Sequence, residues 1–211
     1  MRQIAGDARS NRVLQALLAW YLLVWAVMAI APLDRRDWFL ENILAMALVA
    51  LLVATYRRFS FSTLSYGLIT VFLTLHTVAA HYTYSEVPAG SWLKEILALE
   101  RNHFDRVTHF VFGLLMTYPI REVLVRAAHL RGLWSYVLPV SALLALSSLF
   151  EIVEAWVAQI VSPELGAAYL GTQGDIWDAQ KDMMAALCGA ILCMILTAAL
   201  RHASTQTGGH Q

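Results

Sequence analysis

The sequence is short of charge and nearly free of cysteine. Charged residues make up 14% of its 211 residues, against about 25% in a typical soluble protein. The two cysteines, Cys188 and Cys193, lie i, i+5 in one apolar segment, a spacing that argues against a mutual disulfide. A phosphate-binding glycine loop, a nucleophile elbow, an H-E-x-x-H helix and a haem-attachment motif are all missing. These absences exclude the corresponding nucleotide, hydrolase and haem chemistries, and without a basic patch carrying interleaved aromatics we expect no nucleic-acid partner.

Apolar residues dominate instead, at 59% of the chain, with a mean hydropathy of +0.58. No signal-peptide cleavage site follows the first apolar stretch, which we therefore interpret as a retained span. A helix of about 20 residues crosses the hydrocarbon core of a bilayer. The sequence predicts one all-α, polytopic membrane domain over residues 1–202, in contact with membrane lipids, and a disordered polar tail over 203–211. Its six transmembrane helices are expected near 13–32, 38–56, 62–82, 104–120, 134–157 and 180–200.

Basic residues set the expected orientation. A cytoplasmic N-terminus and C-terminus place more Arg and Lys inside than outside, as membrane proteins prefer. The inner group is Arg2, Arg9, Arg12, Arg57, Arg58, Arg121, Arg126, Arg131 and Arg201. The outer group is Arg35, Arg36, Lys94, Arg101, Arg106 and Lys181. The formal net charge of zero then conceals a basic inner face and an acidic outer face.

In this topology, ionisable residues from several segments gather in the outer leaflet. They are His76, His81, His103, Asp105, His109, Glu151, Glu154, Asp175, Asp178 and Asp182. Charge inside a membrane is costly and marks function by default. Asp105 and His109 are i, i+4, as are Asp178 and Asp182, while Glu151 and Glu154 are i, i+3. Each pair therefore shares one helix face, the arrangement from which bundle metal sites are built.

These residues suggest two roles, each with a structural alternative. The candidate metal ligands are His81, His103, Asp105, His109, Asp178 and Asp182, for zinc, iron or manganese. Glu151 and Glu154 are the candidate acid–base catalysts, with His76, Arg106, Asp175 and Gln180 as accessory groups. Alternatively, Asp105, Arg106 and His109 form a structural ion-pair network, and His76 is a packing histidine. In that case the Asp175–Asp182 segment, Gln180 included, only caps the last helix.

Three segments carry a resemblance to a known family. They are His81-Tyr-Thr-Tyr-Ser-Glu-Val-Pro88, Arg101-Asn-His-Phe-Asp-Arg106 and Gly174-Asp-Ile-Trp-Asp-Ala-Gln-Lys-Asp-Met183. In these motifs and over nearly its whole length, the chain resembles the YjdF-like family of bacterial inner-membrane proteins. The resemblance implies a multi-pass protein of the bacterial inner membrane. It implies no particular biochemical activity, because none is established for that family. The order of a D-R-x-x-H helix, a glutamate-bearing helix and an aspartate before a Gly-Ala helix more loosely resembles VanZ-like membrane proteins, which are associated with the envelope and glycopeptide resistance.

A further similarity concerns membrane zinc hydrolases of the ceramidase and adiponectin-receptor type. Asp105 and His109 match their D-x-x-x-H element. The late H-x-x-x-H pair of those enzymes is missing, because only His129, His202 and His210 follow. Any metal site must therefore mix histidine with carboxylates.

Three functions remain open at this point. The first is a metal-dependent enzyme acting on an envelope or lipid-derived substrate. The second is a proton-coupled transporter that uses Glu151, Glu154 and His76 as a relay. The third is a noncatalytic lipid-binding or envelope structural module.

Overall fold

The computed structural model describes residues 2–208, with side chains described for residues 12–203. Within this range all regular structure is helical. Six long helices, two short ones and one 3-10 turn follow in the order α1 Arg2–Met28, α2 Arg35–Thr55, α3 Thr63–Tyr82, η1 Tyr84–Glu86, α4 Pro88–Ile96, α5 Phe104–Arg126, α6 Trp134–Ile160, α7 Pro163–Leu170 and α8 Asp178–Gly208. The helix α8 thus continues into the tail for which the composition predicts disorder, and residues 209–211 lie outside the described part.

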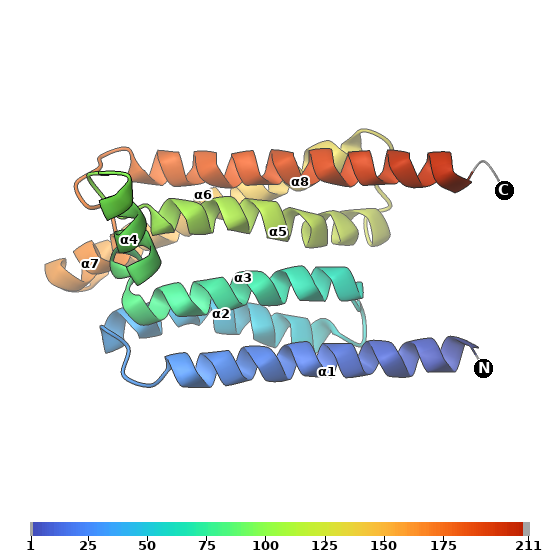
Figure 1. The fold of residues 1–211 in the computed structure, drawn as a ribbon, viewed down its shortest axis with the longest axis horizontal. Helices are drawn as coiled ribbons and strands as arrows, with labels where there is room; N and C mark the ends of the chain where they lie inside the picture. The colour runs from blue at the N-terminus through green and yellow to red at the C-terminus, as the bar shows by residue number, and fades with distance from the viewer. Residues whose placement is uncertain (1, 209–211) are drawn as a thin grey trace.

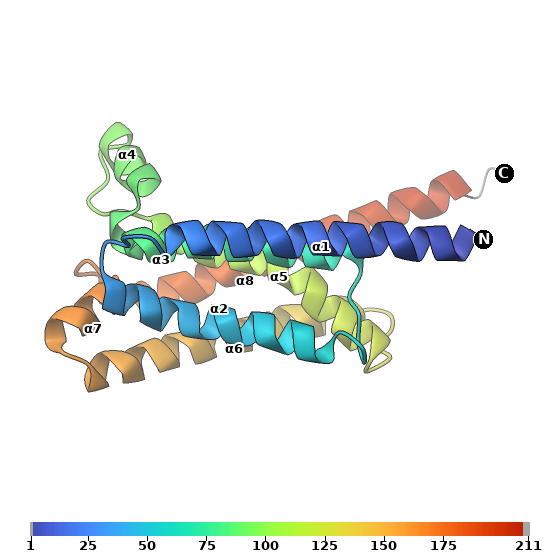
Figure 2. The same ribbon diagram turned by 90° about the horizontal axis from the view of Figure 1, so that it is seen from below.

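The long helices run up and down a bundle, with both ends of the chain at the same end of the molecule (Figure 1). The opposite end carries η1, α4, α7 and the 171–177 loop, and we call it the cap end (Figures 1 and 2). The helices α3 and α5 lie centrally, because α3 packs on α1, α2 and α5 while α5 also packs on α6 and α8. The buried core between them includes Tyr21, Ala45, Ile69, Leu73, Met116, Leu143, Ala186 and Ala190.

Small residues bring α5 and α8 into direct backbone contact. A methyl group added at Gly113 would lie 2.0 Å from the carbonyl oxygen of Ala186, and one at Gly189 would lie 2.1 Å from that of Phe110. Close approach through glycine and alanine replaces the hydrophobic driving force that helices lack inside lipid. This contact fixes the first turn of α5 against the first turn of α8, and both turns carry site residues.

Local signals set the helix ends at the cap. The Asp34 carboxylate accepts hydrogen bonds from the backbone N–H groups of Arg36 and Asp37 at the start of α2. The short helices α4 and α7 both begin with proline at the first position, at Pro88 and Pro163. Gly171 ends α7 in the left-handed conformation at φ +59°. These short helices fall between the predicted spans, α4 between 62–82 and 104–120 and α7 between 134–157 and 180–200.

Four of the described helices are long and apolar enough to cross a membrane, namely Arg35–Thr55, Thr63–Tyr82, Trp134–Ile160 and Asp178–Ala203. Within α1, the residues whose side chains are described, Arg12–Met28, form an apolar helix shorter than 18 residues. The central helix α5 has the length but carries charge near both of its ends. The all-helical membrane architecture is therefore confirmed, with four candidate spans rather than six by this criterion.

Candidate functional site

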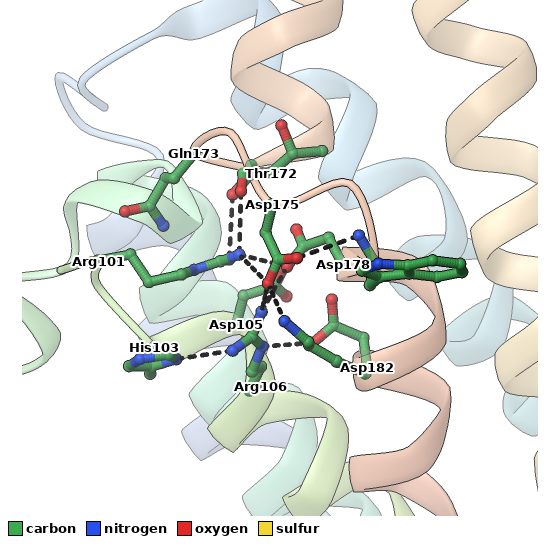
Figure 3. Close-up of polar contacts among 12 residues, drawn as sticks. Arg101, His103, Asp105, Arg106, Thr172, Gln173, Asp175, Asp178 and Asp182 are labelled. Carbon is green, nitrogen blue, oxygen red and sulfur yellow. Dashed lines mark hydrogen bonds and ion pairs between the residues drawn. The ribbon is translucent and has the colours of Figure 1, made fainter. Parts of the chain in front are cut away.

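Two arginines and two aspartates join the loops of the cap end into one cluster (Figure 3). Arg101 precedes α5 and pairs with Asp178, the first residue of α8, and Arg106 in the first turn of α5 pairs with Asp175. Each pair is linked to the other, because Arg106 Nη2 lies 3.1 Å from Asp178 Oδ1 and Arg101 Nη1 lies 3.7 Å from Asp175 Oδ2. We call these four residues the arginine clamp.

The clamp also holds the loop between α7 and α8. Arg101 donates hydrogen bonds to the carbonyl oxygens of Thr172 at 2.9 Å and Gly171 at 3.3 Å. Gln173 closes the same loop, since its side chain accepts from the N–H of Asn102 at 3.0 Å and donates to the carbonyl of Asn102 at 2.9 Å. The clamp and Gln173 therefore together hold the α7–α8 loop against the segment that precedes α5.

Charge at the outer edge of the cluster is well matched. Lys181 Nζ lies 2.6 Å from Asp175 Oδ2. This ammonium, a backbone N–H bond and the Arg106 guanidinium together hold the pKa of Asp175 well below its usual range. His103 Nδ1 lies 3.2 Å from Arg106 Nη1, and burial together with the two guanidinium groups lowers the pKa of His103. His103 is therefore placed as a neutral partner of the clamp.

Beneath the clamp, three aspartates converge. Asp105, Asp178 and Asp182 each offer a carboxylate oxygen, and these oxygens lie within 4.8 Å of one another. Asp182 is 2% exposed, and its Oδ1 atom has no hydrogen-bond partner within the described part of the chain, with Arg106 Nε at 3.8 Å. We call Asp105, Asp178 and Asp182 the aspartate triad.

His109 connects the triad to α6. Its Nε2 atom lies 3.6 Å from Asp105 Oδ1 and 3.5 Å from Glu151 Oε1. Glu151 Oε1 is buried and forms no shorter hydrogen bond with any side chain or backbone group that the structure describes. Both carboxyl groups thus lie beside the same ring nitrogen of His109, at distances slightly longer than a hydrogen bond.

A cavity of about 340 Å³ adjoins this group and runs between α2, α3, α5 and α6. Its polar end lies toward the cap and contains Glu41, His76, Tyr84, Asp105, His109, Glu154 and Tyr169. Toward the middle of the bundle its walls are apolar, with Leu44, Leu48, Phe72, Phe112, Met116 and Leu146 among the lining residues. The volume falls in the range of small-molecule sites, about 300–1,000 Å³.

Carboxyl groups outnumber cations at this end of the molecule. Around the clamp and the cavity the acids are Glu41, Asp105, Glu151, Glu154, Asp175, Asp178 and Asp182, whereas the basic side chains that pair with them within the described residues are Arg101, Arg106 and Lys181, with His109 beside Asp105 and Glu151. The clamp cations engage Asp175 and Asp178 most closely. Buried carboxyl groups without such partners must hold protons or bind a cation.

The predicted site residues separate into three groups. The structure brings Asp105, His109, Glu151, Glu154, Asp178 and Asp182 together around the polar end, with Arg106, Asp175 and His103 in or beside the clamp. His76 lies on the cavity wall, with Nδ1 bonded to the Tyr84 hydroxyl and Nε2 3.1 Å from the Glu41 carbonyl oxygen. His81 and Gln180 are not brought into the cluster. His81 Nδ1 lies 2.8 Å from the carbonyl oxygen of Met28, and Gln180 is exposed.

Sequence reasoning missed residues that the fold adds to the polar end. Glu41 is 4% exposed and lines the cavity from α2, and Asp37 one turn earlier is 1% exposed and accepts a hydrogen bond from Thr83 at 2.8 Å. Asp37 and Glu41 have the same i, i+4 spacing as Asp105 with His109 and Asp178 with Asp182. The sequence pattern that predicted those two pairs could therefore have predicted this one. Tyr84 and Tyr169 lie in η1 and α7, and burial followed by the nearby Glu41 raises the pKa of both hydroxyls.

Comparison with known proteins now gives the family. Residues 13–203 match a family described as predicted membrane protein (DUF2238). The chain belongs to this family. It is also 37% identical to the inner membrane protein YjdF of Escherichia coli strain K12 over 184 aligned residues. The aligned region covers 87% of each chain.

Membership confirms the expected YjdF-like family and agrees with a multi-pass protein of the bacterial inner membrane. The looser VanZ-like resemblance stays a prediction. No solved structure matches the chain.

Proposed function

We propose that this protein acts on an envelope or lipid-derived molecule, using a divalent cation held by the aspartate triad. The observation that carries the proposal is the aspartate triad itself, adjoining a cavity whose other end is apolar. A buried, unpartnered carboxylate oxygen on Asp182 is costly unless a cation or proton compensates it. Three carboxylates favour hard cations such as Mg²⁺ or Mn²⁺, and the nearby imidazole of His109 makes Mn²⁺ our first choice among the metals considered.

The surrounding residues suit acid–base work on a bound molecule. His109 lines the cavity, and its Nε2 atom faces Asp105 and Glu151, so these carboxyl groups can orient the ring while it exchanges a proton with a bound ligand. Glu154 lines the same end and offers a second proton-carrying group. When bound, a divalent cation would supply electrostatic stabilisation and lower the pKa of a ligated water.

The proposal includes a six-span topology with both termini in the cytoplasm, so that the cap end faces the periplasm. It is supported by the greater number of basic residues on the terminal side. Both chain ends also lie together in Figure 1. In this topology α1 and α5 complete the set of spans, and α5 keeps its charged first turn at the level of the clamp.

Metal binding is the first test. Detergent-purified protein is dialysed against Mn²⁺, Mg²⁺ or Zn²⁺, and bound metal is quantified by elemental analysis and calorimetric titration. Asp182→Asn should weaken Mn²⁺ binding by at least about tenfold, since even indirect partners of metal ligands contribute 10–100-fold. Glu164→Gln, at an exposed acid on α7, is the matched control.

Saturable Mn²⁺ binding that Asp182→Asn weakens and Glu164→Gln preserves would support the site. Folded protein that binds none of the three metals would overturn it. If the triad variants then changed only the melting temperature, the noncatalytic module would be the better description.

A further inference from the structure

The cavity opens sideways toward the lipid. Three of its lining leucines are also about half exposed, at 44% for Leu44 on α2 and at 48% and 53% for Leu146 and Leu149 on α6. In the described part of the chain, α2 packs against α3 and α7 and α6 packs against α5, α7 and α8, but α2 and α6 do not pack extensively on each other. The space between α2 and α6 is therefore a lateral opening.

The short helix α7 closes this opening at the cap. It packs on both α6 and α2, and its Tyr169 is 6% exposed and lines the polar end of the cavity. Figure 2 shows α7 at the cap end, beside the ends of α2 and α6. A molecule that enters the cavity from the side must therefore pass through the hydrocarbon region, which favours a ligand with an alkyl chain.

On each wall of the cavity, the ionisable lining residues lie nearer the cap end than the apolar ones. Glu41 lies one turn nearer the cap than Leu44, and His76 one turn nearer than Phe72. On α5, Asp105 precedes Phe112 by about two turns on the way from the cap. A chain in the lower part and a polar headgroup at the cap end would match this gradient, as they do in one leaflet of a bilayer.

Available hydrogen-bonding groups then select the headgroup. Glu41 is 4% exposed, and its Oε2 atom has no hydrogen-bond partner within the described residues. Both ring nitrogens of His76 are already engaged, by the Tyr84 hydroxyl and the Glu41 backbone. The group on this wall that can still form a hydrogen bond with a ligand is thus the Glu41 carboxyl oxygen, which accepts hydrogen bonds and attracts positive charge.

We propose that the cavity takes up, between α2 and α6, a lipid whose headgroup bears a protonated primary amine, and that Glu41 binds this ammonium. A primary ammonium offers three N–H donors and a positive charge. An anionic headgroup without an amine would place its charge beside the Glu41 carboxyl group with no N–H donor for it. The inference rests on the proposed function solely in taking this bound lipid for the substrate.

Lipid retention tests the inference. Protein purified in a maltoside detergent is mixed with equal amounts of phosphatidylethanolamine, phosphatidylcholine and phosphatidylglycerol of identical acyl chains, and the retained lipid is counted by native mass spectrometry. The wild type should retain phosphatidylethanolamine about tenfold over the other two, the factor expected of one charge-assisted hydrogen bond. Phosphatidylcholine has the positive charge without N–H donors, so it separates the two contributions.

Two variants address the two halves of the cavity. Glu41→Gln keeps the side-chain size and should reduce the preference for phosphatidylethanolamine to near unity. Leu44→Trp fills the lateral opening and should lower retention of this lipid about tenfold. Leu51→Trp, two turns along α2 at an exposed position outside the cavity lining, is the matched control.

Equal retention of the three lipids by the wild type would overturn the inference, and so would an undiminished preference in Glu41→Gln or equal retention by the two tryptophan variants. Mn²⁺ affinity of Leu44→Trp is measured alongside and should match the wild type. If the wild type binds no metal but still selects phosphatidylethanolamine, the proposed function is overturned and this inference is not.

Discussion

Arg101 is expected to be the strongest single determinant of order at the cap end. Its side chain is 9% exposed and pairs with Asp178, which is 6% exposed. Removing one partner of a buried ion pair costs about 3–5 kcal/mol, because the other charge is left uncompensated. Arg106 still reaches Asp178 at 3.1 Å, so the lower end applies. Arg101→Gln should therefore lose about 3 kcal/mol.

Thermal melting in detergent measures this loss. For a chain of this length, about 2–4 °C is lost per kcal/mol, which gives a fall of about 6–12 °C. Arg36→Gln, an exposed arginine at the same end, is the control and should change the midpoint by less than about 2 °C. In a double-mutant cycle, Arg101→Gln and Asp178→Asn should couple by about 1–3 kcal/mol. Additive effects, or a fall for Arg101→Gln no larger than that of the control, would refute the clamp.

Three further outcomes are expected. Gly189→Leu should lower stability by more than about 2 kcal/mol, because its side chain would meet a backbone carbonyl of α5; Gly67→Leu, where a methyl group meets nothing within 4 Å, should lose far less in the same melting assay. Tyr84→Phe removes the hydroxyl bonded to His76 and should cost about 1 kcal/mol by thermal melting. Because the pKa of Asp175 is depressed in the folded protein, Asp175→Asn should destabilise at pH 7, and the difference from wild type should shrink when melting is repeated near pH 3.

Long helices were predictable because their cause is local. An apolar run long enough to cross a bilayer has no other stable arrangement, and the spans expected near 62–82 and 134–157 correspond to α3 at Thr63–Tyr82 and α6 at Trp134–Ile160. Spacing within a helix was equally informative. The i, i+4 relation of Asp105 and His109 predicted a shared face, and their side chains lie 3.6 Å apart.

Contacts between distant segments were not predictable in the same way. Arg101 lies in a loop, and its pairing with Asp178 depends on how α5 and α8 meet through Gly113 and Gly189. Glu41 enters the site because α2 borders the same cavity as α6. Periodicity gives the face of a helix but not the neighbour opposite that face, so Glu41 was missed.

The position of a residue along its helix does not determine which neighbouring segment its side chain contacts. Counting turns predicts His81 near the end of its helix, and it lies in the last turn of α3, yet its ring nitrogen Nδ1 lies 2.8 Å from the carbonyl oxygen of Met28 at the end of α1. The last turn of α3 there faces the α1–α2 connection, since Leu33 N–H also bonds the carbonyl oxygen of His81. His81 therefore contacts the α1–α2 connection and does not line the cavity.

The two levels of charge at the cap have different physical consequences. At the clamp, arginine and lysine pair closely with Asp175 and Asp178, so this level holds loops together. Deeper in, Glu41 and Asp182 each have a buried oxygen without a hydrogen-bond partner among the described residues, and Glu154 lines the cavity beside Glu41. A uniform acidic patch would be expected to bind cations at its surface first. Because Asp175 at the outer edge is already paired with Arg106 and Lys181, positive charge is instead favoured at the buried level, beside the lateral opening through which an amine-bearing lipid would arrive.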